Sequence, residues 1–221
     1  MAGYRGILFD MDGVLVDSEP LFHKAVNVVV ERCGAPVITE EENNRYLLGT
    51  TVEETWVRVR ELREIRQTPE ELLAIYNVVV KEVLRSDLTA RPGVRALIAE
   101  AQRRGLPIAV ASSSLREWVD LKLSVIGLTD AFPVALGGDD VVRGKPEPDI
   151  YMKAARLIGL EAPQCVAIED SPIGLAAASA SGAYTVCTLT DSTRHLDLSV
   201  ADVIIENLES FDYDLLAPGP A

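Results

Sequence analysis

The chain has 221 residues, a length that suits one large domain or two small ones. Its composition is that of an ordinary globular protein, with 48% hydrophobic and 25% charged residues, which excludes collagen-like and disordered chains. Acidic residues (34) outnumber basic residues (21), and the formal net charge of -13 leaves no basic patch for nucleic acid or an anionic membrane. We therefore expect neither nucleic acid nor a membrane as a partner.

The first apolar run, residues 7–9, is too short to be the hydrophobic region of a signal peptide. The longest uncharged run, residues 171–190, has the length of a membrane helix, but its proline, glycines and hydroxyl side chains favour a helix packed on a sheet. Cys33, Cys165 and Cys187 lack metal-ligand spacing, so we expect reduced thiols. These features predict a cytoplasmic protein, and the lack of a conspicuous apolar surface segment predicts a monomer.

Apolar runs bounded by turn residues recur along the chain, and each is typical of a buried strand. Helix-like stretches of roughly 10 to 15 residues separate the last five runs. This alternation predicts an α/β fold with a doubly wound, Rossmann-like parallel sheet that is covered on both faces. The runs are residues 4–9, 107–111, 133–136, 165–168, 184–189 and 203–205.

The interval between the first two strands has no strand-like segment and carries three helix starts. Each start is a threonine followed three residues later by a glutamate, the pattern of a capping box, and Pro69 occupies the favoured first helical position in one of them. The interval therefore predicts a helical domain, residues 17–89, inserted into a Rossmann-like core of residues 1–16 and 90–221. The threonines are Thr39, Thr51 and Thr68.

Two carboxylates lie just beyond the first predicted strand. Asp10 follows that strand directly, and Asp12 lies two residues further on, before Gly13. Open parallel sheets bind ligands beyond the carboxyl ends of their strands. An acidic pair before glycine is also typical of a simple turn, so this pattern alone leaves both interpretations open.

Serines follow the second predicted strand. Ser112 and Ser113 come first, and Ser114 with Glu117 matches a capping box, which predicts hydroxyl and amide groups at an anion-binding helix terminus. A simple helix cap would account for Ser114 but does not require Ser112.

The third and fourth predicted strands also lead into charged residues. Lys145 lies between a glycine and a proline, so it cannot lie inside a helix, and it is either a solvated loop lysine or an anion ligand. Glu169 and Asp170 form a second acidic pair, which could also be a helix cap. Four successive strand ends therefore offer carboxylates, a hydroxyl and an ammonium group.

This combination has one strong chemical interpretation. Carboxylates bind a hard cation, which often completes its coordination with substrate phosphate. Lys145 and Ser112 would hold phosphate oxygens while a carboxylate acts as the nucleophile. Phosphate-monoester hydrolysis requires rate enhancements of up to ~10²¹, whereas a single acid-base group supplies about 10²–10⁴, so the reaction needs the whole set of groups.

At these residues the sequence resembles the haloacid dehalogenase superfamily of phosphotransferases over essentially the whole chain. The four strand-end motifs occur in the family's order. Three longer stretches resemble the branch that contains sugar-phosphate phosphatases and β-phosphoglucomutases, in which a helical insertion forms a mobile cap. These stretches are residues 17–21, 144–148 and 169–174.

The resemblance implies catalytic and metal-binding roles. Asp10 would attack phosphorus and become an aspartyl phosphate, while Asp12 would protonate the leaving oxygen and then take a proton from water. Mg²⁺ would be held by Asp10, the main-chain carbonyl of Asp12 and Asp170, with Glu169 assisting.

The resemblance also implies how the phosphoryl group is bound. The side chains of Ser112 and Lys145 would contact its oxygens. The main-chain amides of Met11, Asp12 and Ser113 would complete the binding site.

These roles predict a Mg²⁺-dependent phosphoric monoester hydrolase acting on a small phosphorylated metabolite, with a sugar phosphate as the expected substrate. A β-phosphoglucomutase-like phosphomutase is the first alternative. Such mutases keep a cap arginine three residues beyond a glycine, whereas Val52 lies three residues beyond Gly49 here, and His23 is one place out of register with their cap histidine. A receiver-like phosphoacceptor module for signalling is the alternative from another class.

Overall fold

The computed structural model describes residues 3–47 and 50–219, so Gly49 lies outside the described residues. The chain divides into two compact units. Residues 1–17 and 89–221 form one, here called the sheet unit, and residues 18–88 form the other, called the helical unit. The domain boundaries predicted above lie one residue from these divisions.

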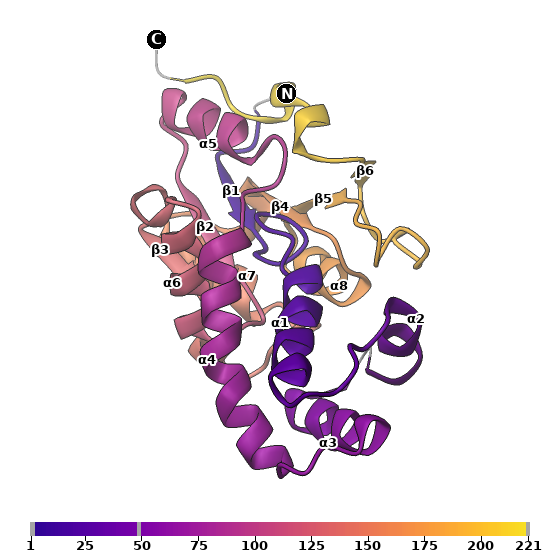
Figure 1. Cartoon of the computed structure of the whole chain (residues 1–221). Coiled ribbons are helices and arrows are strands. Elements are labelled where there is room, and N and C mark those ends of the chain that lie inside the picture. Colours follow the sequence, from indigo (N-terminus) through magenta and orange to yellow (C-terminus); the bar gives the residue numbers. More distant parts are fainter. Residues whose placement is uncertain (1–2, 48–49, 220–221) are drawn as a thin grey trace. The chain divides into compact units, whose positions relative to one another are not determined.

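The sheet unit contains a six-stranded sheet in the order β3-β2-β1-β4-β5-β6, and every neighbouring pair is parallel (Figure 1). The doubly wound fold predicted from the sequence is confirmed. The strand order reverses between β1 and β4, which is where open α/β sheets form their ligand crevice. The strands are β1 (Gly6–Phe9), β2 (Ile108–Ala111), β3 (Val134–Leu136), β4 (Cys165–Glu169), β5 (Tyr184–Thr188) and β6 (Val203–Ile205).

The central strands are buried on both faces. Every residue of β1, β2 and β4 is buried, as expected for a parallel sheet with helices on both sides. On one face, Leu8 and Ala167 pack in a cluster with Tyr151 and with Ala177 and Ala178. The two alanines allow a helix to lie close to the sheet, which explains the small residues in the uncharged run.

In the described part of the sheet unit, four α-helices lie between the strands, and short 3-10 turns occur between these elements and after β6. The α-helices are α5 (Val94–Arg103), α6 (Arg116–Val125), α7 (Asp149–Leu157) and α8 (Pro172–Ala180). The 3-10 turns are Thr129–Ala131, Gly138–Asp140, Ala162–Gln164, Leu208–Ser210 and Tyr213–Leu215. Among the described residues, no helix is long and apolar enough to cross a membrane.

The helical unit is built from α1 (Glu19–Arg32), α2 (Glu40–Glu42), a π-helical turn (Asn43–Leu47), α3 (Val52–Arg63) and α4 (Pro69–Asp87). The three predicted capping boxes are confirmed. Thr39, Thr51 and Thr68 each accept from a main-chain amide three residues later, and the glutamate there bonds back to the threonine amide. Trp56 of α3 packs against Tyr76 of α4, and the centroids of the two rings lie 5.4 Å apart.

Candidate active site

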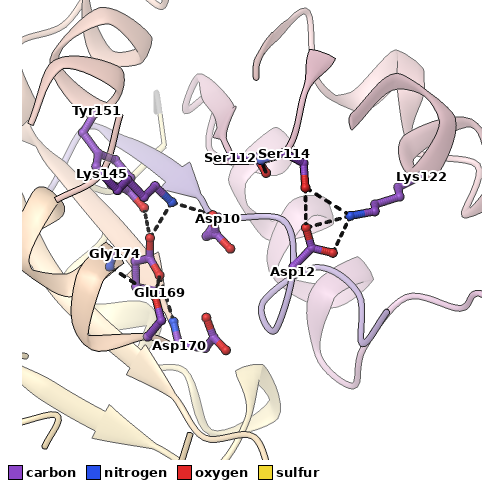
Figure 2. A network of polar contacts seen from close by, with 11 residues as sticks. Asp10, Asp12, Ser112, Ser114, Lys122, Lys145, Tyr151, Glu169, Asp170 and Gly174 are labelled. Carbon is purple, nitrogen blue, oxygen red and sulfur yellow. Dashed lines mark hydrogen bonds and ion pairs between the residues drawn. The ribbon is translucent and has the colours of Figure 1, made fainter. Parts of the chain in front are cut away.

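Three buried carboxylates meet at the point where the strand order reverses (Figure 2). Asp10 follows β1, and its main-chain amide donates to the carbonyl of Ile168 on β4 at 2.9 Å. That pairing places Asp10 beside Glu169, the last residue of β4, and Asp170. Each residue offers a carboxylate oxygen within 4.8 Å of the other two. The parallel register of β1 and β4 is therefore what brings together two acidic motifs far apart in the sequence.

Lys145 lies among these carboxylates. Its ammonium group donates to Asp10 Oδ1 at 2.5 Å and to Glu169 Oε1 at 2.6 Å. Glu169 Oε1 also accepts from the hydroxyl of Tyr151, which belongs to α7. Only 4% of the Lys145 side chain is exposed, so this residue is not the solvated loop lysine that the sequence left as an alternative.

Two glycines allow the acidic side chains to approach the backbone closely. Gly13 has a positive φ of 81°, and a Cβ there would lie 2.0 Å from Asp170 Oδ2. A Cβ on Gly174 would lie 2.0 Å from Glu169 Oε1. Any larger residue at either position would displace a carboxylate of the cluster.

Burial makes this cluster electrostatically unusual. It raises the pKa of Asp10 to about 7, despite the opposing charge of Lys145. Burial, together with the charges of Asp10 and Glu169, also raises the pKa of Asp170 to about 8. Burial acts to lower the pKa of Lys145, but the charges of Asp10 and Glu169 outweigh it and raise that pKa.

The cluster fits a hard divalent cation. Three carboxylates beside one ammonium group leave excess negative charge, and carboxylate oxygens are the ligands that Mg²⁺ prefers. Asp10, Glu169 and Asp170 are all among the metal ligands expected from the sequence. The contribution expected from Asp12 is its main-chain carbonyl, and that role stays a prediction.

The carboxylate of Asp12 belongs to a second group of polar side chains. The ammonium group of Lys122, on α6, donates to Asp12 Oδ1 at 2.5 Å and to Oδ2 at 2.7 Å. The hydroxyl of Ser114 donates to Oδ2 at 2.9 Å. Figure 2 shows the Asp12 carboxylate turned toward Lys122 and away from the group around Lys145.

Lys122 was not identified from the sequence, although one signal was available. It lies on α6 between Val119 and Leu123, both buried, and Ile126 just beyond the helix is buried as well. These positions have the spacing of a core-facing helical stripe. A lysine inside such a stripe indicates a buried charge that needs a partner.

The capping box predicted for Ser114 and Glu117 is wrong. Helix α6 begins at Arg116, and Leu115 precedes it without a side-chain cap. The amide of Arg116 donates instead to Asp139 Oδ1 at 2.7 Å, while the Ser114 hydroxyl is bonded to Asp12. The carboxylate of Asp139 therefore caps the helix, and the Ser114 hydroxyl donates to Asp12 instead of capping.

A cavity of about 340 Å³ contains three of the predicted phosphate-binding residues. Ser112, Ser113 and Lys145 all line it, together with Gly138 and Gly144 among others. Ser112 is buried, and its hydroxyl accepts from the amide of Ser114 at 3.1 Å. The side chain of Met11 is fully buried in the core, so its expected contribution concerns only the main-chain amide.

In the helical unit, residues from all three longer helices line a separate pocket of about 250 Å³. His23, Val52 and Tyr76 are among them. His23 Nε2 lies 3.0 Å from the carbonyl oxygen of Ile38, so it is tied to the backbone rather than lying free on a helix surface. Val52 is 43% exposed at the start of α3.

Comparisons with known proteins agree with this arrangement. Residues 7–188 match the model of the family described as haloacid dehalogenase-like hydrolase. The chain is 31% identical to Protein CbbY of Rhodobacter capsulatus, over 93% of this chain and 94% of the relative. It is also 31% identical to the phosphorylated carbohydrates phosphatase of Thermotoga maritima, over 80% and 82% of the two chains.

A solved structure from Thermotoga maritima, described as a candidate beta-phosphoglucomutase, superposes with a TM-score of 0.85. It is 28% identical to this chain, and the match covers 93% of this chain and 95% of that one. Because the match covers 93% of this chain, it includes residues of both the sheet unit and the helical unit.

Proposed function

The chain belongs to the haloacid dehalogenase-like hydrolase family, and on that premise we propose that it is a Mg²⁺-dependent phosphatase acting on a sugar phosphate or a similar small phosphorylated metabolite. The observation that carries the proposal is the buried Asp10 carboxylate, which lies within hydrogen-bond distance of Lys145 and in one cluster with Glu169 and Asp170. This environment offers a nucleophile, a cation for phosphate oxygens and a set of metal ligands in one place.

In the first step, an Asp10 carboxylate oxygen bonds to phosphorus while the bond from phosphorus to the leaving oxygen breaks. Lys145, which donates to Asp10, and Ser112, which lines the same cavity as Lys145, stabilise the negative charge on the transferring oxygens. The leaving oxygen takes a proton from Asp12, and the product is an aspartyl phosphate with a free alcohol.

In the second step, water attacks phosphorus and gives a proton to Asp12. The bond from phosphorus to Asp10 breaks, which releases inorganic phosphate and restores the carboxylate. Asp12 therefore alternates between acid and base, while Asp10 carries the phosphoryl group.

Asp10, Asp170 and the main-chain carbonyl of Asp12 would hold the magnesium ion, with Glu169 assisting. The bound ion would supply positive charge that reduces the repulsion between the Asp10 carboxylate and the phosphate oxygens. The electrostatics of the cluster support this assignment, because burial and neighbouring negative charge raise the pKa of both Asp10 and Asp170.

The phosphomutase remains the second candidate, favoured by the likeness to the structure described as a candidate beta-phosphoglucomutase. A mutase must hold the second phosphate of a bisphosphate intermediate, for which an arginine is well suited. Val52, the first residue of α3, lies three residues beyond Gly49, the spacing at which the resemblance implies that arginine, so hydrolysis is the outcome we favour. The receiver-like module is set aside, because the family match spans the helical unit as well as the sheet.

The test is phosphate release from a panel of phosphorylated metabolites in the presence of Mg²⁺. With β-glucose 1-phosphate and catalytic glucose 1,6-bisphosphate, we expect inorganic phosphate, little glucose 6-phosphate and no activation by the bisphosphate. Rapid formation of glucose 6-phosphate that depends on the bisphosphate would instead establish the mutase. A wild-type protein that is inactive on the whole panel would contradict both assignments.

A further inference from the structure

Lys122 is a charged residue at a core position. Its side chain is 1% exposed, and Val119 and Leu123 are its buried neighbours on α6. Placing an ammonium group in such surroundings is costly unless it is paired and hydrogen-bonded. Here the ammonium group donates to both carboxylate oxygens of Asp12, so the pairing accounts for its position.

The contacts of Asp12 form a connected network within the sheet unit. Lys122 and Ser114 together contribute three hydrogen bonds to the Asp12 carboxylate. Lys122 also lies 3.4 Å from the Ser114 hydroxyl, and the Ser114 amide donates to Ser112 Oγ. The network therefore runs from Asp12 to the cavity that contains Ser112 and Lys145 (Figure 2).

This network fixes where the Asp12 carboxylate lies. The Asp12 side chain is 35% exposed, whereas Asp10 is buried. Packing therefore restrains Asp12 less than it restrains Asp10. Without Lys122, two of these three hydrogen bonds would disappear. Displacing a catalytic group by about 1 Å can reduce a rate by roughly 10²-fold.

We propose that Lys122 is a positioning residue, which holds the side chain of Asp12 where its protonated form can give a proton to the leaving oxygen and its carboxylate form can then take one from water. The inference rests on the proposed phosphatase function. Lys122 contacts the side chains of Asp12 and Ser114, and in the proposed mechanism it acts through Asp12. Its removal should therefore impair only the steps that depend on Asp12.

The test replaces Lys122 with methionine, which keeps the apolar stem and removes the charge. The matched control is Lys153→Met in α7, because Lys153 donates to the main-chain oxygen of Asp140 instead of to a side chain of the site. Unfolding curves for every variant establish the folded fraction. If Lys122→Met does not fold, Lys122→Gln takes its place, since glutamine keeps a neutral N–H donor.

We expect Lys122→Met to lower kcat by about 10- to 100-fold, with KM nearly unchanged. The effect on kcat/KM should depend on the leaving group. It should be large for glucose 6-phosphate, whose leaving alkoxide needs a proton, and within about threefold for p-nitrophenyl phosphate, whose phenolate does not. A purely structural defect would lower both values equally.

A double-mutant cycle with Asp12→Asn completes the test. If Lys122 acts through Asp12, Lys122→Met should have little further effect in the Asp12→Asn background. Additive losses, or an active wild type with an unimpaired Lys122→Met variant, would overturn this inference and leave the phosphatase standing. A wild type that is inactive on every phosphate ester would overturn both.

Discussion

The sheet unit and the helical unit use their charged residues differently. In the sheet unit, Lys122 and Lys145 are almost completely buried and are paired with carboxylates at strand ends. In the helical unit, the pair of Arg32 with Glu82 lies in solvent, and such a pair contributes at most about 1 kcal/mol to stability. The largely buried Arg63 pairs there with Glu42, a residue of the Thr39 capping box. The strand topology therefore brings together the carboxylates and lysines of the candidate site, whereas the capping threonines of the helical unit bond to the first turns of their own helices.

The largest effect that the comparison predicts is the loss of turnover in Asp10→Asn. The amide keeps the shape of the side chain but cannot act as the nucleophile, so phosphate release should fall by about 10⁴-fold or more. Phosphate release and circular dichroism of the same samples would check this result. Unaltered turnover in a folded variant would remove Asp10 from its assigned role.

The next effect concerns the metal. Asp170→Asn removes a charged oxygen from the cluster, so the Mg²⁺ concentration that gives half-maximal activity should rise by about 10-fold or more. A Mg²⁺ titration of initial rates measures the shift. Asp197→Asn is the matched control, because Asp197 lies outside the cluster and its carboxylate accepts from the amide of Ser199. Identical titrations for Asp170→Asn and the wild type would exclude Asp170 as a ligand.

A smaller effect should appear in the pH dependence of stability. Burial raises the pKa of Asp10 to about 7 and that of Asp170 to about 8, so the metal-free folded state binds these protons more tightly than the unfolded chain does. Their contribution to stability is therefore greatest at low pH and is lost as pH rises from about 4 to about 8.

In a chelating buffer, these two groups should make the melting temperature several degrees lower at about pH 8.5 than at about pH 6. The decrease should be smaller in Asp170→Asn, and Mg²⁺ should reduce it in the wild type by binding the folded state. Thermal melts at both pH values, with and without Mg²⁺, measure these differences. An equal decrease in Asp170→Asn and the wild type would show that Asp170 does not cause it.

The smallest effect belongs to the helical unit. Thr68→Ala removes the side-chain acceptor that caps α4, and the free energy of unfolding should fall by about 1 kcal/mol. Thr68→Ser keeps the hydroxyl and should be close to the wild type. Denaturant unfolding measures the stability, and kcat should change by less than about twofold in either variant. A large loss of kcat in the folded Thr68→Ala protein would contradict the proposed division of roles between the units.

Much of the fold could be predicted from the sequence because its signals are local. The apolar runs predicted all six strands, and Thr39, Thr51 and Thr68 identified their helix starts through residues only three positions away. The failure at Ser114 has a different origin. Helix α6 is capped by Asp139, and the Ser114 hydroxyl donates to Asp12. Both aspartates come from other parts of the chain.

The candidate site shows the same limit. The meeting of Asp10 with Glu169 and Asp170 could be anticipated, because the ends of parallel strands share one edge of the sheet. The pairing of Asp12 with Lys122 could not be anticipated. The two residues are 110 positions apart, and no local sequence pattern indicates which residue pairs with a buried lysine. The catalytic roles of these residues stay predictions until they are measured.

The most direct measurement of the central claim is the detection of a phosphoryl group on Asp10. The wild-type protein would be mixed with its substrate and Mg²⁺ and quenched in acid within a single turnover. Mass spectrometry of the peptide that contains Asp10, with and without borohydride reduction, would then locate the group. We predict phosphorylation at Asp10, conversion of that residue to homoserine by borohydride, and neither product in Asp10→Asn. Turnover without a phosphorylated Asp10, or with the phosphoryl group on another residue, would contradict the account.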